Sequence, residues 1–143
     1  MFIPGICLCD CVGDGVSECV GEQKISDPTQ LEVYKMAHEL TILIYKLTAN
    51  FPKEELFGLS SQMKRAASSI CANLMEGSYR NNTKEFRQFC GIARGSAGEL
   101  KYFLILSSDL GYLDKNIAMG LITKTDTISK MIYGLIKSLE RKI

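Results

Sequence analysis

The stretch that decides the fold is MKRAASSICANLMEGSYRNNTKEFRQFCGIARGSAGELKYFL, residues 63–104. It indicates the end of one helix, a polar turn at Asn81-Asn82-Thr83, and most of a second, longer helix. At a helical rotation of 100° per residue, one polar face of the first helix covers about 80°. Its members are Arg65, Ser69, Asn73, Glu76 and Arg80. A basic face on the second helix holds Lys84, Arg87, Arg94 and Lys101. An amphipathic helix needs only one ordered apolar face, so two ordered polar faces predict a surface that contacts another molecule.

The rest of the chain outside residues 1–26 follows the same helical pattern. Asp27-Pro28 is typical of a helix start, so the first helix is expected to begin there. It is expected to end before Phe51-Pro52, because the residue that precedes a proline disfavours the helical conformation. Its seam consists of Val33, Ala37, Leu40, Ile44 and Leu47. Further helices are expected at about residues 58–79, 84–110 and 115–142, with Asn82 and Glu85 as a capping box. Four helices with short connections predict an all-α, antiparallel up-down-up-down four-helix bundle.

The third predicted helix has an unusually broad apolar face, which predicts burial against more than one neighbour, including another subunit. The same helix contains Gly91, Gly95 and Gly98, although each glycine inside a helix costs about 1 kcal/mol relative to alanine. We therefore expect the backbone there to be approached closely by a partner helix or a ligand. Close helix packing is the simpler interpretation.

Composition divides the chain into residues 1–26 and residues 27–143. The first segment is rich in glycine and cysteine, with one lysine against four carboxylates; we interpret it as a flexible extension. Its cysteines follow C-x-C-x-C-x7-C, which is not the paired spacing of structural zinc sites, and a misassigned start of translation is a further alternative. With no membrane-length apolar run and no basic leader, the protein is expected in the cytoplasm, away from the membrane.

The sequence does not assemble a catalytic centre. GIARGSAG lacks the ending of a phosphate-binding loop and falls inside a helix. Glu76, Glu85 and Glu99 lack the Glu-x-x-His pairing of di-iron bundles, since His38 is the single histidine. Cys71 and Cys90 fit small core residues. We therefore expect no enzyme activity, no cofactor and no metal.

Two consecutive runs, RAASSICANLMEGSYR and KEFRQFCGIARGSAGEL, resemble the signature of a bacterial four-helix-bundle family. Some members of that family are encoded in intervening sequences of 23S ribosomal RNA genes. A related branch is the accessory variability protein, Avd, of diversity-generating retroelements. The resemblance extends from about Glu32 to the C-terminus and does not distinguish the branches. Cys71 stands where the family often has a proline, which puts a kink in doubt but not the fold.

The resemblance implies an assembly and a partner. The family is associated with homopentameric barrels whose basic surface contacts RNA or DNA and, in the retroelement branch, a reverse transcriptase. The side chains that would carry such contacts here are Lys64, Arg65, Arg80, Lys84, Arg87, Arg94 and Lys101. For Ser69, Asn73, Glu76 and Glu99 we expect a structural polar network with arginines across a helix or subunit boundary, because carboxylates repel a polyanion.

Two functions from different classes therefore remain. The first is a non-enzymatic, oligomeric nucleic-acid-binding accessory or scaffold protein that works with a reverse transcriptase. The alternative is a purely structural homo-oligomer in which the charged faces form only salt bridges. The nature of the nucleic acid, the family branch and the role of residues 1–26 stay open from sequence.

Overall fold

A computed structural model of the chain describes residues 27–143, which form four α-helices and no strand. The helices are α1 (Glu32–Thr48), α2 (Leu59–Ser78), α3 (Thr83–Asp109) and α4 (Lys115–Glu140), with 3-10 turns at Pro28–Gln30 and Lys53–Glu55. The prediction of an all-helical fold is confirmed for this part of the chain. The expectations for the cysteine-rich segment fall on residues 1–26 and lie outside the described residues.

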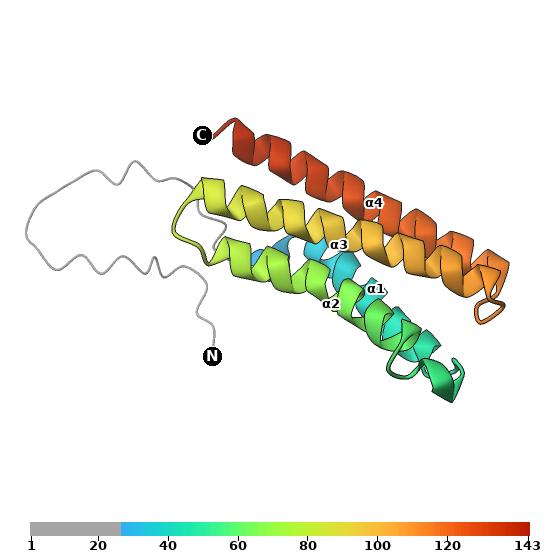
Figure 1. Cartoon of the computed structure of the whole chain (residues 1–143). Helices are drawn as coiled ribbons and strands as arrows, with labels where there is room; N and C mark the ends of the chain where they lie inside the picture. The colour runs from blue at the N-terminus through green and yellow to red at the C-terminus, as the bar shows by residue number, and fades with distance from the viewer. Residues whose placement is uncertain (1–26) are drawn as a thin grey trace, which may run out of the picture.

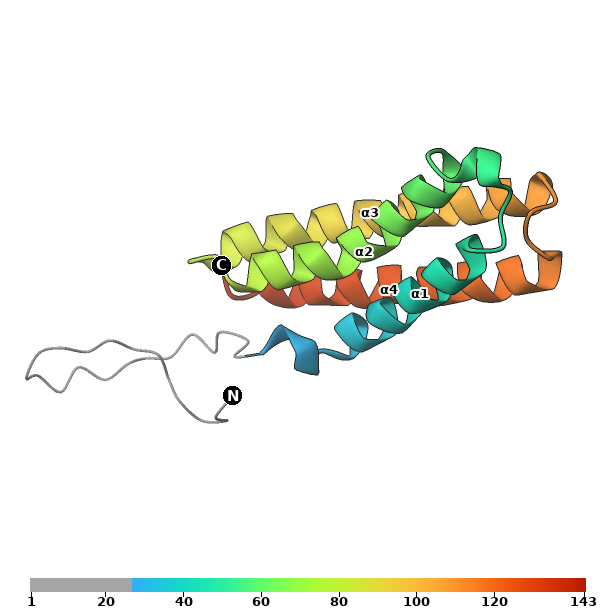
Figure 2. The same ribbon diagram turned by 90° about the horizontal axis from the view of Figure 1, so that it is seen from below.

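The helices pack around one shared apolar core. Its fully buried large side chains come from all four helices and include Leu40, Ile44, Met63, Ile70, Leu74, Leu100, Leu104, Ile128 and Ile132. Helix α3 has the most extensive packing, against both α2 and α4, whereas α1 contacts α4 least. Figure 1 shows α3 lying between α2 and α4. The α2–α3 turn is at one end of the molecule and the α3–α4 turn at the other, and Figure 2 shows the same from below.

Two connections form as their residue types predict. The Asn82 side chain accepts a hydrogen bond from the backbone N–H of Glu85 at 2.8 Å, which caps α3. At the other end, Gly111 takes a positive φ of 79° directly after the helix, a conformation that glycine adopts without steric cost. Local chemistry therefore fixes both ends of the longest helix.

The predicted start of the first helix is wrong by a few residues. Asp27 does act as a cap, and its carboxylate accepts from the backbone N–H of Thr29 at 3.0 Å. The capped element is, however, only the 3-10 turn Pro28–Gln30, after which Leu31 is extended and α1 begins at Glu32. An Asp-Pro pair specifies the start of a turn of helix but does not specify that the turn continues.

The expectation for the α3 glycines is also wrong within this chain. A Cβ added at Gly91, Gly95 or Gly98 would meet nothing within 4 Å, so no helix of the described chain packs closely on them. The close approach instead occurs at Gly77 of α2, where an added Cβ would lie 2.6 Å from the Cβ of Phe89. Approach to the α3 glycines by another subunit or a ligand stays a prediction.

Candidate nucleic-acid interface

The end of α2 and the start of α3 are held together closely, and this places the first group of predicted cations. Gly77 allows Phe89 to pack directly against the α2 backbone. Arg80, two residues beyond the end of α2, then lies over the Phe89 ring at 4.8 Å and pairs with Glu76 at 2.7 Å. Lys84 follows in the first turn of α3 and is exposed. The tight crossing therefore brings two exposed cations to the same end of the molecule.

The other three predicted cations of α3 face α4. Arg87, Arg94 and Lys101 are spaced seven residues apart, so they lie in one row along the helix. Each contacts a residue of α4. Arg87 pairs with Glu140 at 3.8 Å and Lys101 with Asp126 at 2.8 Å. Arg94 donates to the Ser129 hydroxyl at 3.4 Å and lies 4.8 Å from the centre of the Tyr133 ring. We call this row of cross-helix contacts the α3–α4 ladder.

The ladder contacts are partly exposed and therefore weak. The side chains of Arg87 and Lys101 are 39% and 41% exposed, and their carboxylate partners are similarly accessible. Exposed ion pairs of this kind contribute about 0–1 kcal/mol and weaken further with salt. The ladder aligns α3 with α4 but leaves these cations open to a competing anion at modest cost.

The remaining predicted cations lie on α2. Lys64 places its ammonium 5.3 Å from the centre of the Tyr45 ring on α1. Arg65 is exposed, and like Lys84 it forms no ion pair with any other residue in 27–143. Arg65 and Lys84 are therefore predicted site residues whose charge is offset neither by an ion pair nor by an aromatic ring within the described chain.

The predicted structural polar network is formed in part. Ser69 and Ser96 share a hydrogen bond of 2.9 Å between α2 and α3, and the Asn73 amide donates to the Ser69 Oγ at 2.9 Å. Glu76 pairs with Arg80 on its own helix rather than across to α3. Glu99 is exposed and forms no ion pair among residues 27–143. The Ser69 and Ser96 hydroxyls therefore join α2 to α3, the Asn73 amide supports Ser69 within α2, and the two carboxylates do not link the helices.

Sequence reasoning missed the contribution of the C-terminus to this end of the molecule. The Arg87–Glu140 pair brings the end of α4 against the start of α3, and both ribbon views show the C-terminus beside the α2–α3 turn. Lys137, Arg141 and Lys142 thereby join Arg80, Lys84 and Arg87, and we call these six residues the basic end. The Lys137 ammonium donates to Glu140 at 3.0 Å, which raises the pKa of that lysine. The one feature of the sequence that could have indicated this contribution is the cluster of cations near its C-terminus.

The two thiols in the described residues are not activated. Burial raises the pKa of the Cys90 thiol to about 12 and that of the Cys71 thiol to about 11, because an apolar environment disfavours the thiolate. Within residues 27–143 no group of three or more metal-ligating side chains is close enough to hold a metal ion. In the same residues, none of the helices has the length and apolar run that a bilayer span requires.

Comparison with known proteins identifies one family and several similar solved chains. A family model for the 23S rRNA-intervening sequence protein matches residues 29–134. The crystal structure of a protein of unknown function from the S23 ribosomal protein family of Bacteroides thetaiotaomicron is similar, with a TM-score of 0.66 and 26% sequence identity. The match covers 73% of this chain and 98% of that chain. Comparison with curated proteins found no match.

Proposed function

Because the chain belongs to the family of 23S rRNA-intervening sequence proteins, we propose that it is a non-enzymatic scaffold that binds nucleic acid. The basic end is the observation that carries this proposal. It combines six cations from the ends of α2 and α4 and the start of α3, of which Arg80, Arg87 and Lys137 pair with Glu76 or Glu140. Lys84 and the two cations after α4, Arg141 and Lys142, form no ion pair within the described residues. An excess of positive charge at one place attracts a phosphate backbone even when the whole chain is nearly neutral.

Self-association would strengthen the weak electrostatic attraction between the basic end of one chain and a polyanion. Exposed apolar side chains on α3, including Ile92 and Tyr102 at 53% and 58% exposure, flank the uncovered glycines and support burial against a second copy. The positions of the three connections support an antiparallel, up-down-up-down order. In the homopentamer that we propose, the basic ends would be repeated around one axis, and multivalent contact would raise the apparent affinity.

The reverse-transcriptase partner comes from the resemblance to Avd, and the partner and a cytoplasmic location are both part of the proposal. We place the protein in the cytoplasm, bound to structured RNA or DNA, with a retroelement reverse transcriptase as its protein partner. The chain would then hold nucleic acid for an enzyme rather than act on it.

A second candidate function has its own supporting observation. Arg80, Arg87 and Lys101 already pair with carboxylates of the same chain, which is what a purely structural protein would show. In that case the charged faces would only align helices, and the oligomer would not bind nucleic acid.

Salt-dependent affinity separates the two functions. Binding of a fluorescent structured RNA would be measured from 50 to 300 mM salt for the parent protein and for the triple variant K84Q/R141Q/K142Q. If each cation contacts one phosphate, the triple variant should bind more weakly and lower the slope of log K against log salt by about 2–3. The charge-matched control K53Q/K115Q/K130Q, which changes lysines away from the basic end, should behave as the parent. Equal loss in both triple variants, or no binding at any salt, would contradict the proposal.

A further inference from the structure

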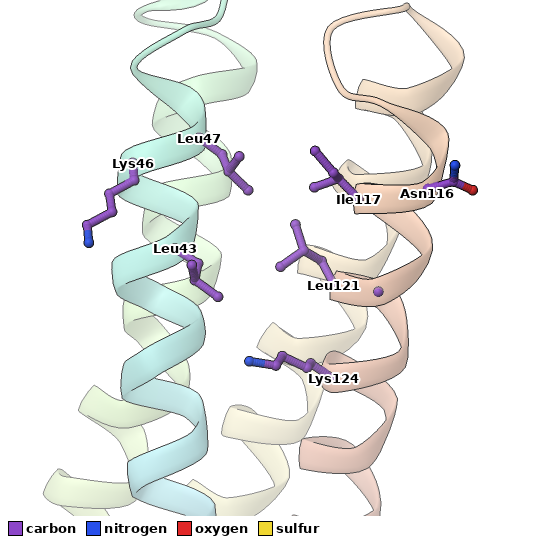
Figure 3. A pocket seen from close by; sticks show the side chains of 8 residues that line it. Leu43, Lys46, Leu47, Asn116, Ile117, Leu121 and Lys124 are labelled. Carbon is purple, nitrogen blue, oxygen red and sulfur yellow. The ribbon is translucent and has the colours of Figure 1, made fainter.

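An apolar groove between α1 and α4 lies apart from all the cations discussed above. It has a volume of about 360 Å³ and is lined by Leu43, Lys46, Leu47, Asn116, Ile117, Gly120, Leu121 and Lys124. Figure 3 shows Leu43 and Leu47 pointing from α1 toward α4, and Ile117 and Leu121 pointing back. Within residues 27–143 no hydrogen bond or ion pair between side chains joins these two helices. The groove is therefore a separation between two helices that meet less closely than the others.

The groove combines an apolar lining with positive charge at its edge. Figure 3 shows Lys124 extending across the gap toward α1, whereas the Lys46 side chain points away from α4. No carboxylate lines the groove, and neither lysine forms an ion pair with a described residue. The complementary ligand thus has an apolar body and an anionic head.

We propose that this groove binds a free medium-chain fatty acid, with the acyl chain between the four apolar side chains and the carboxylate at Lys124. The volume is at the lower end of the roughly 300–1,000 Å³ typical of small-ligand sites, which suits one short acyl chain. Each methylene group removed from water contributes about 0.8 kcal/mol. This inference does not depend on nucleic-acid binding, because the groove and the basic end share no residue.

Gly120 offers a specific way to close the groove. A Cβ added there would meet nothing within 4 Å, so the side chain of Gly120→Leu starts in open space at the lining of the groove. Gly134 is a matched control on the same helix, since it is equally uncovered and does not line the groove. Replacing either helical glycine favours the helix, so both variants are expected to fold.

The test is titration of decanoate into the full chain by isothermal calorimetry, with the neutral 1-decanol as a second probe. The parent and Gly134→Leu should bind one decanoate per chain, and Gly120→Leu should bind at least about tenfold more weakly. The variant K46Q/K124Q should lose about tenfold for decanoate but little for decanol, whereas K115Q/K130Q should lose nothing for either.

Three results would overturn the proposal. They are undiminished decanoate binding in Gly120→Leu, equal affinity of the parent for decanoate and decanol, and a lower assembly mass for Gly120→Leu but not for Gly134→Leu by light scattering. The last result would show that a second copy of the chain occupies the groove. Loss of RNA binding in the basic-end variant would affect none of these outcomes.

Discussion

Replacing Gly77 with alanine should destabilise the bundle, although alanine is the better helix former. An added Cβ would lie 2.6 Å from the Cβ of Phe89 and 2.8 Å from the Cδ2 of Phe86. The Phe89 Cβ is attached directly to the α3 backbone, so a side-chain rotation cannot move it away. Phe86 is 7% exposed and has little space to rotate. The two helices must therefore separate at this crossing.

The size of the effect follows from two opposing contributions. Reaching an ordinary contact of 3.4 Å requires a separation of about 0.8 Å at the crossing. Overpacking of this kind costs about 1–3 kcal/mol, and the higher helix propensity of alanine returns about 1 kcal/mol. The difference is about 0–2 kcal/mol, and we expect Gly77→Ala to lower the free energy of unfolding by up to about 2 kcal/mol. In the control Gly91→Ala the added Cβ meets nothing within 4 Å, so stability should rise by about 0.5–1 kcal/mol.

Urea unfolding followed by circular dichroism measures both variants against the parent. The opposite signs of the two changes are the informative result, because helix propensity alone would stabilise both variants. A Gly77→Ala protein that is stabilised as much as Gly91→Ala would refute the close α2–α3 crossing. The placement of Arg80 over Phe89, and with it the geometry of the basic end, would then need revision.

Three further predictions concern the cap, the ladder and the buried thiol. Asn82→Ala should lower the free energy of unfolding by about 1 kcal/mol in urea, and Asn82→Asp should retain it, because only the side-chain acceptor is required; equal losses would contradict the cap. Asp126→Asn should cost less than about 1 kcal/mol at low salt and nothing measurable in 1 M salt, since its pair with Lys101 is half exposed; a larger, salt-independent cost would contradict this. Burial raises the pKa of the Cys90 thiol from its ordinary 9.0 to about 12, so the stability due to its neutral form is complete below pH 9 and is lost as pH rises toward 12. Unfolding in urea at pH 8 and pH 10.5 should show this loss, Cys90→Ala should reduce it, and iodoacetamide should not label folded Cys90 at pH 8; rapid labelling would contradict the burial.

The sequence was sufficient where structure depends on neighbouring residues in the chain. The turn at Asn81-Asn82-Thr83 and the capping residue Asn82 were predicted from local chemistry, and α3 spans Thr83–Asp109 against an expected 84–110. The start of α1 was wrong because the Asp27-Pro28 pair specifies a turn, and its continuation depends on how Leu31 packs against the core. Local patterns therefore predicted which segments are helical better than they predicted the residue at which a helix begins.

The relations between helices could not be predicted to the same extent. The basic face of α3 has no acidic residue of its own, yet Asp126 and Glu140 of α4 pair with it. Their pairing depends on the register in which two helices dock, and helical periodicity does not specify that register. The same reason explains why the α3 glycines were expected to be packed, although no described residue covers their face. The basic end likewise appears only when the ends of α2 and α4 are placed beside the start of α3.

The most direct test of the central claim is multi-angle light scattering of the full chain, with and without a structured RNA, at low and moderate salt. The proposed scaffold predicts an assembly of several copies that gains the mass of the RNA at low salt and loses it as salt rises. An assembly whose mass is unchanged by RNA and DNA at every salt would contradict nucleic-acid binding and favour the purely structural function. A monomer would contradict the proposed assembly itself.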